Sequence, residues 1–343
     1  MNTRERIETA LSGGTPDRTP LAVYTYFTGD WTADDRWRRL IDMGLGLHHE
    51  TGTVRVIEHG VEDAHETALR DGRNVHVHTR RTPAGEIRQV FVNNWQTEHF
   101  VKSPADYKVL QWIVEHSECV ADYDGFARAE DKVGQAGFVN VDYGRTPAMT
   151  INVDLAGTER FCMDVAMETP ELMDLYHAMC ERFLEMTRIV AAGPGRFVRW
   201  LENLTIGMLG PRRYEDLLLS VYRRAAPILH AAGKRIMVHY DGQLSVVRDQ
   251  IASAPFDILE SLTEPPEGDM TYDQCRAAWP DKAFWANINV GCFGLPPEQL
   301  KAEVAARRSR AGKKALAFEI SEDLPANFQQ TVPVVLETLE QLC

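Results

Sequence analysis

The sequence lacks the features that define several common classes of protein. It contains no run of about 18 apolar residues, and its first residues are charged and amphipathic, so neither a transmembrane helix nor a secretory signal core is indicated. Its six cysteines form no CxxC pair and have no regular spacing, which is not the pattern of a disulfide framework. We therefore expect a cytoplasmic protein with reduced thiols.

Nucleotide-binding and serine-hydrolase motifs are also missing. No GxGxxG or GxxxxGK[ST] follows an apolar strand, and no G-x-S-x-G elbow occurs. The formal charge is −13, whereas nucleic acids and anionic membranes require a basic face on the protein that binds them. We expect neither of them as a partner.

What is present is an alternation of apolar strands and amphipathic helices. Between about 53 and 100 the sequence is β-rich, and Pro83-Ala84-Gly85 predicts a turn there. A capped helix is predicted over 103–116. From about 135 onward we expect strands near 136–142, 197–202, 234–240, 257–262, 283–289 and 314–320. Helices are expected near 2–12, 170–191, 211–231, 243–253, 270–279, 296–309 and 328–341.

Repeated strand–helix–strand units imply a parallel sheet with right-handed crossovers. Strands from the amino-terminal third bring the count to about eight, which favours a closed barrel over an open sheet. Barrels of this kind often exceed the usual domain size. We therefore predict a single domain over 1–343, an α/β (β/α)8 TIM barrel with an N-terminal helical and β-hairpin elaboration.

Active sites of such barrels lie at the carboxyl ends of the strands. The residues expected there are Asp142, Tyr143, Glu202, Asn203, His239, Asp241, Glu260, Glu264, Asn289, Cys292, Glu319 and Glu322. His239 and Asp241 are two residues apart, so in an extended strand their side chains point to the same side. One histidine with several carboxylates, and with one thiol as an option, makes a reasonable Zn²⁺ shell.

Each of these residues also has a structural interpretation. His239 and Asp241 can form a hydrogen-bonded pair without metal, Glu202 can pair with an arginine, and Cys292 can be a buried thiol. The pairs His48 with His49 and His76 with His78 are interpreted as surface or packing histidines.

Six segments resemble the uroporphyrinogen decarboxylase superfamily. They are 3-TRERIETALSGGTPDRTPLAVY-24, 79-TRRTPAGEIRQVF-91 with 102-KSPADYKVLQ-111, 156-AGTERFCMDVAMETPEL-172, 238-VHYDGQL-244 and 287-NINVGCFGLPPEQL-300. The resemblance covers essentially the whole chain and implies a single barrel with an N-terminal elaboration. The true decarboxylase carries an arginine-rich segment after its PDR-P motif, whereas 21-LAVYTYFTGDW-31 contains no arginine.

The TPAGE hairpin and the following helix resemble the corrinoid-dependent methyltransferase branch of that superfamily. Members of this branch bind zinc through a His-x-Cys-Gly motif and a second cysteine after the last strand. Here Asp241 stands in place of the first cysteine, and 318-FEISEDLP-325 offers Glu319 or Glu322 in place of the second. Carboxylates are harder ligands than thiolates, so the resemblance implies zinc or a harder divalent metal.

The resulting expectation is a metal-dependent methyltransferase. It would move a methyl group between a small O- or N-methylated compound and a corrinoid on a partner protein. We expect His239, Asp241, Glu322 and Glu202 as metal ligands, and Tyr143 or Glu264 as the proton donor. Three alternatives stay open: a decarboxylase or lyase of a small non-porphyrin acid, a non-catalytic binding protein with a decayed metal site, and methyl transfer to a folate-like acceptor.

Overall fold

The computed structural model describes residues 1–203 and 206–342, with the side chains of 206–208 left out of the description. The chain divides into two compact units. The barrel unit comprises 1–53, 122–143 and the chain from Ala191 onward, and the sheet unit comprises 54–121 and 144–190. The expectation of a single domain stays a prediction. Within the described residues no helix is long and apolar enough to span a bilayer.

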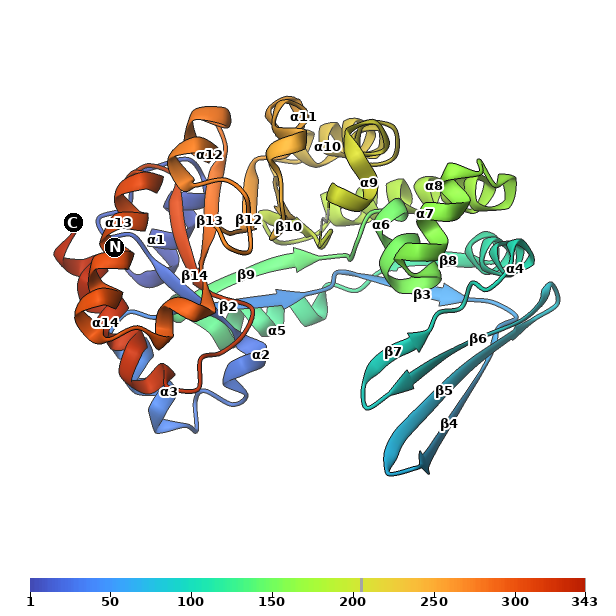
Figure 1. Ribbon diagram of the computed structural model, residues 1–343, viewed down its shortest axis with the longest axis horizontal. Coiled ribbons are helices and arrows are strands. Elements are labelled where there is room, and N and C mark those ends of the chain that lie inside the picture. The colour runs from blue at the N-terminus through green and yellow to red at the C-terminus, as the bar shows by residue number, and fades with distance from the viewer. Residues whose placement is uncertain (204–205, 343) are drawn as a thin grey trace. The chain divides into compact units, whose positions relative to one another are not determined.

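Eight parallel strands close into a barrel in the order β1-β14-β13-β12-β11-β10-β9-β2 (Figure 1). They are β1 (Leu21–Tyr24), β2 (Gly46–Thr51), β9 (Gly137–Asp142), β10 (Phe197–Trp200), β11 (Arg235–His239), β12 (Ile258–Leu262), β13 (Ala283–Ile288) and β14 (Leu316–Ile320). The predicted (β/α)8 TIM barrel is confirmed.

Helices alternate with these strands along the chain. The barrel unit contains α1 (Thr3–Leu11), α2 (Thr25–Thr28), α3 (Asp35–Asp42), α5 (Asp124–Val133), α9 (Ile206–Arg213), α10 (Ser220–Ala231), α11 (Arg248–Ser253), α12 (Tyr272–Ala278), α13 (Pro297–Ala311) and α14 (Phe328–Gln341). The helix predicted over 211–231 is interrupted: a π-helical segment, Tyr214–Leu219, separates α9 from α10, and Gly210 breaks α9 with a φ of 69° before Pro211. A proline cannot supply the amide hydrogen that a continuous helix needs.

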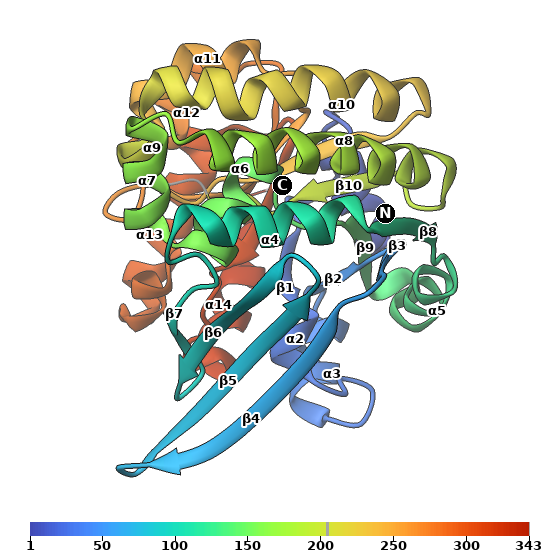
Figure 2. The same cartoon turned by 90° about the vertical axis from the view of Figure 1, so that its right-hand side faces the viewer.

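The sheet unit contains the predicted antiparallel strands (Figure 2). Its two sheets are β3-β8 and β4-β5-β6-β7, formed by β3 (Val54–Glu58), β4 (Glu62–Arg70), β5 (Arg73–Thr82), β6 (Gly85–Val92), β7 (Trp95–Glu98) and β8 (Ser117–Ala121). Its helices are α4 (Pro104–Glu115), α6 (Pro147–Met149), α7 (Thr158–Ala166) and α8 (Pro170–Ala192), with a π-helical segment over Thr150–Ala156. The helix predicted after Ser103 is confirmed, and Ser103 with Asp106 forms its capping box.

Along the barrel strands, one face changes from apolar to polar toward the carboxyl end. Phe138, Phe197, Met237, Trp285 and Ala317 belong to one buried cluster, which also includes Ile7, Ala10 and Leu11 of α1. Two residues further along the same strands lie Asn140, Arg199, His239, Asn287 and Glu319, all buried. Because side chains two apart share a face, α1 and the apolar residues fill the amino-terminal end of the barrel. Polar groups are thereby concentrated toward its carboxyl-terminal end, where barrel active sites lie.

Candidate metal centre

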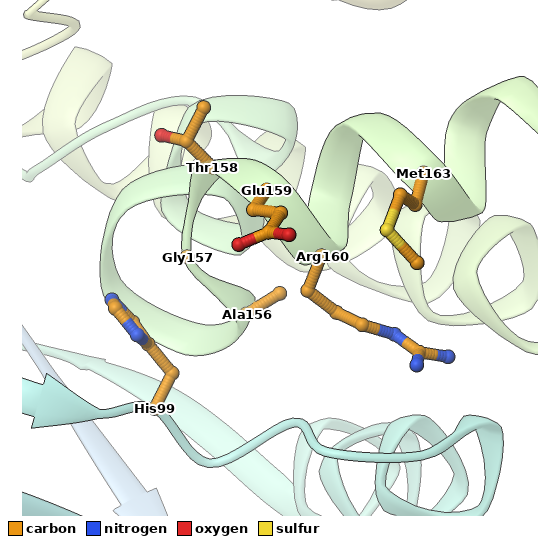
Figure 3. A pocket seen from close by; sticks show the side chains of 7 residues that line it. All are labelled: His99, Ala156, Gly157, Thr158, Glu159, Arg160 and Met163. Atoms are coloured by element: carbon orange, nitrogen blue, oxygen red, sulfur yellow. The ribbon is translucent and has the colours of Figure 1, made fainter.

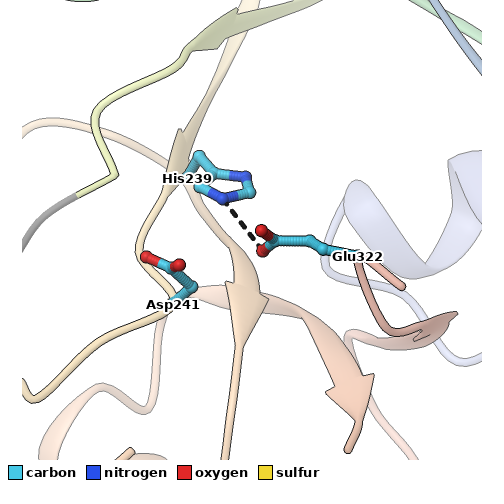
Figure 4. A group of neighbouring side chains, drawn as sticks. All are labelled: His239, Asp241 and Glu322. Carbon is cyan, nitrogen blue, oxygen red and sulfur yellow. Dashed lines mark ion pairs between the residues drawn. The ribbon is translucent and has the colours of Figure 1, made fainter. Parts of the chain in front are cut away.

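Three of the four predicted metal ligands lie together. His239, Asp241 and Glu322 each offer a ligand atom, and these atoms lie within 4.8 Å of one another (Figure 4). His239 ends β11 and Asp241 follows two residues later, whereas Glu322 comes two residues after β14. Nε2 of His239 lies 3.1 Å from Oε1 of Glu322. One imidazole and two carboxylates form a donor set suited to a divalent cation.

The second ring nitrogen of His239 is held by a buried carboxylate. Nδ1 of His239 donates a hydrogen bond to Oε2 of Glu260 at 2.8 Å, and both side chains are almost fully buried. This contact turns Nε2 toward Glu322. A carboxylate on the far nitrogen of a histidine fixes the ring and the tautomer in many metal sites. Glu260 therefore orients His239 for the candidate metal.

A β-bulge in β12 positions the carboxylate of Glu322. The register of β12 against β13 shifts between Glu260 and Leu262, and Ser261 between them has a φ of 62°. The hydroxyl of Ser261 donates to Oε1 of Glu322 at 2.7 Å and accepts from the amide of Asn287 at 2.8 Å. Bulges next to active sites commonly redirect side chains. Here the bulge links Glu322, which follows β14, to strands β12 and β13.

Arg199 is a buried cation shared by several carboxylates. Its guanidinium forms ion pairs with Glu50, with Asp142 at 2.8 Å and with Glu260 at 3.5 Å. The hydroxyl of Tyr24 also donates to Glu260. Only 3% of Arg199 is exposed, so its charge is screened little by solvent. The arginine holds together carboxylates that would otherwise repel one another.

The pKa values in this cluster reflect a surplus of acidic groups. Burial opposes a charge on His239, but Glu260 and then Glu322 outweigh it and raise the pKa of the imidazole to about 10. Burial raises the pKa of Glu50 to about 7 despite Arg199, and it also raises the pKa of Asp241. A cation bound among these groups would relieve their repulsion and displace the proton from His239.

His48 is a second buried histidine, and it contacts the carboxyl group of Glu319. Nε2 of His48 donates to Oδ1 of Asn140 at 2.7 Å, and Nδ1 lies 3.1 Å from Oε2 of Glu319. Burial lowers the pKa of His48 to about 3, and burial together with the neighbouring Glu260 raises the pKa of Glu319 well above its ordinary value. The ring of His48 also stacks on Trp285 with centroids 4.2 Å apart.

The sequence interpretation of His48 as a surface or packing residue did not foresee its link to Glu319. The alternation of His48 with Glu50 on β2 was the available signal, because both belong to one face of that strand. Neither His48 nor Arg199 is the last residue of its strand, and the ends of the strands are where the sequence predicts site residues.

The fourth predicted ligand, Glu202, lies outside the group of three. Its fully buried carboxylate accepts a hydrogen bond from the hydroxyl of Tyr222 at 2.9 Å, and that hydroxyl lies 2.8 Å from the hydroxyl of Tyr240. Tyr240 directly follows His239, so Glu202 reaches the metal centre through two tyrosines.

The two predicted proton donors occupy other surroundings. The hydroxyl of Tyr143 accepts a hydrogen bond from the indole of Trp200 at 2.7 Å. Glu264 forms ion pairs with Arg310 at 2.6 Å and Arg307 at 3.1 Å, and it accepts the backbone N–H of Tyr272 at 2.8 Å. The Tyr143 hydroxyl and the Glu264 carboxylate are thus both already engaged by other groups of the protein.

Cys292 lies in the short 3₁₀ turn Val290–Gly294 and is buried. Burial raises the pKa of its thiol, although the nearby Arg307 opposes this shift. A thiol in such surroundings is less reactive than an exposed one. Cys292 is not part of the converging group formed by His239, Asp241 and Glu322.

A separate hollow lies within the sheet unit, at the start of α7 (Figure 3). It has a volume of about 410 Å³, and His99, Thr158, Glu159 and Arg160 contribute its polar lining. Arg160 already donates to Asp164 at 2.5 Å. Its lining in the described part of the chain includes none of the predicted site residues, and we assign it no chemistry.

Comparison with known proteins gives a likeness in fold. No protein-family model matches the chain, and no curated protein matches it. A methyltransferase from Methanosarcina mazei aligns over 100% of this chain and 99% of its own, with a TM-score of 0.60 and 10% sequence identity. A B12-independent methionine synthase from Shewanella sp. W3-18-1 aligns over 92% of this chain and 88% of its own, with a TM-score of 0.48 and 9% sequence identity. The chain shares the fold of the first of these proteins along its whole length.

Proposed function

We propose that the protein is a metal-dependent methyltransferase of the corrinoid-linked branch of the uroporphyrinogen decarboxylase superfamily. It would transfer a methyl group between a small O- or N-methylated compound and a corrinoid carried by a partner protein. The observation that supports this most directly is the convergence of His239, Asp241 and Glu322 at the carboxyl-terminal end of the barrel. The sequence resemblance and the fold shared with a methyltransferase agree with it.

The donor set fits a divalent metal. Nδ1 of His239 is occupied by Glu260, so Nε2 is directed to the side where Glu322 and Asp241 offer oxygen atoms. Zinc accepts nitrogen and oxygen ligands, and the absence of thiolates from the group also suits a harder metal. When bound, the metal supplies Lewis-acid polarisation of the substrate oxygen or nitrogen.

The residues of the chain would hold the metal, orient its ligands and supply a proton to the leaving group. His239, Asp241 and Glu322 hold the metal, Glu260 keeps the ring of His239 in place, and Ser261 fixes Glu322. Departure of an oxygen or nitrogen from its methyl group is easier when a proton is available. Burial raises the pKa of Glu50 to about 7, so part of the population carries a proton near neutral pH, and we propose Glu50 for this role.

Metal analysis tests the proposal first. The untagged protein, purified without chelator, should retain close to one equivalent of zinc or another divalent metal after gel filtration. His239→Ala, Asp241→Ala and Glu322→Gln should lose it, while His49→Ala, a half-buried neighbour on β2, should keep it. Metal-loaded protein is then assayed with methyl ethers and methylamines and a reduced corrinoid.

Two results would contradict the proposal. Folded wild-type protein that takes up no metal on reconstitution would exclude the Lewis-acid site. Turnover of a small acid without any corrinoid, lost in His239→Ala, would instead establish the lyase alternative.

A further inference from the structure

We propose a second metal site, for a divalent transition metal such as Zn²⁺, Ni²⁺ or Cu²⁺, formed by His65 and His76 on the hairpin of β4 and β5. This hairpin belongs to the four-stranded sheet of the sheet unit (Figure 2). His65 lies opposite His78, and Thr67 lies opposite His76. Because side chains two apart on a strand share a face, all three histidines occupy one face of the hairpin.

The separation of two ring nitrogens fits coordination of one ion. Nδ1 of His65 lies 3.4 Å from Nε2 of His76. This distance is long for a hydrogen bond, for which about 2.7–3.2 Å is usual. Two nitrogens bound tetrahedrally to one zinc ion at about 2.0–2.1 Å lie about 3.3–3.4 Å apart. The spacing of these two nitrogens is therefore already close to that of two ligands on one metal ion.

The other contacts of these rings keep the two nitrogens available. Nδ1 of His76 is hydrogen-bonded to the hydroxyl of Thr67 at 3.0 Å, which leaves Nε2 facing His65. A partner on the far nitrogen orients a ligating histidine. The ring of His65 stacks on that of His78 with centroids 4.3 Å apart and an interplanar angle of 18°. Both rings are thus already held in place before a metal arrives.

His78 braces the site and is not assigned as a ligand. Its Nε2 donates to Asp63 at 2.7 Å, and its Nδ1 accepts from the amide of Gln89 at 3.2 Å, so both ring nitrogens are engaged. With two protein ligands, water completes the coordination. Such a site is open and should bind more weakly than the buried group around His239. Imidazole ligands favour zinc, copper and nickel over calcium or magnesium.

Calorimetric titration of the full-length protein with zinc chloride tests this site. Wild-type protein should bind two zinc ions, and His239→Ala should bind one. At the zinc concentration that saturates His239→Ala, the double variants His239→Ala with His65→Ala and His239→Ala with His76→Ala should bind none. Loss of a ligand should weaken zinc affinity at least about tenfold. Removing only a residue that hydrogen-bonds to a metal ligand already lowers metal affinity by about that factor. His59→Ala is the matched control, since His59 is 61% exposed on the same unit and pairs only weakly with Glu118 at 3.3 Å.

A second readout is protection of the hairpin tip. Zinc should slow tryptic cleavage after Arg70 and Arg73, which flank the turn, in wild type but not in His65→Ala, because binding stabilises the closed hairpin. Binding unchanged by His65→Ala, or reduced equally by His59→Ala, would overturn the proposal. A wild type that binds one ion, lost only in His65→Ala, would support this site and contradict the central one.

Discussion

Glu260 and Glu264 lie four residues apart at the end of one barrel strand, and both are buried against arginine. Glu260 shares Arg199 with Glu50 and Asp142 and also contacts His239. Glu264 instead has two guanidinium groups and a backbone N–H. The first glutamate belongs to a cluster with surplus negative charge, and the second is fully neutralised.

This difference distinguishes a site from a structural anchor. A buried ion pair whose charges are fully compensated adds little net stability. Removing one partner is nevertheless costly, because the other charge is then buried without compensation. A surplus of buried carboxylates is costly unless a cation is bound, so it indicates where a metal or a cationic group would be stabilised. Sequence position alone does not separate Glu260 from Glu264, since both lie near the end of β12.

The largest effect should come from removing the cation of the first cluster. Arg199→Met keeps much of the side-chain volume but leaves Glu50, Asp142 and Glu260 without their shared charge. We expect a loss of about 3–5 kcal/mol in unfolding free energy at pH 8. Without the guanidinium, which lowers it, the folded-state pKa of Glu50 would rise further above 7, so the part of the lost stability that Glu50 accounts for should return as the pH falls to 5.

Urea denaturation at pH 5 and pH 8 measures this difference. The matched variant is Arg182→Met, whose guanidinium is bound chiefly by backbone oxygens and one partly exposed glutamate and so should show no comparable recovery at low pH. Equal destabilisation of Arg199→Met at both pH values would show that the carboxylates do not repel one another as described.

A smaller effect, without loss of metal, is expected at the second cluster. Glu264→Ala leaves Arg307, which is 4% exposed, without its buried carboxylate partner, and we expect destabilisation of about 3 kcal/mol. Glu303→Ala, a partly exposed partner of the same arginine, should cost about 1 kcal/mol or less. Metal content should be unchanged in both variants. Metal loss from folded Glu264→Ala would assign Glu264 to the site.

The sequence predicted the barrel from its repeated strand–helix–strand units. It also predicted that His239 and Asp241 lie together, from their spacing of two residues, although β11 ends at His239 and Asp241 follows it. It also placed Glu322 near them, since the carboxyl ends of parallel strands meet. The roles of Glu260 and Glu264 could not be separated in this way. The arginines that neutralise Glu264 lie on α13, more than 40 residues later, and the bulge at Ser261 leaves no clear pattern in the sequence.

The smallest effect should come from Glu50, and it has the opposite sign to the first. Burial raises its pKa from 4.5 to about 7, so its contribution to stability is fully present below pH 4.5 and is lost as the pH rises through 7. Glu50→Gln removes that loss. In metal-free protein the variant should therefore be more stable than wild type by about 1–2 kcal/mol at pH 8, with little difference at pH 4.5. Glu66→Gln, on exposed β4, should show neither change. Thermal unfolding of the three metal-free proteins at pH 4.5 and pH 8 measures these differences. A Glu50→Gln variant less stable than wild type at pH 8 would mean that the ion pair with Arg199 outweighs the cost of burying the Glu50 carboxylate.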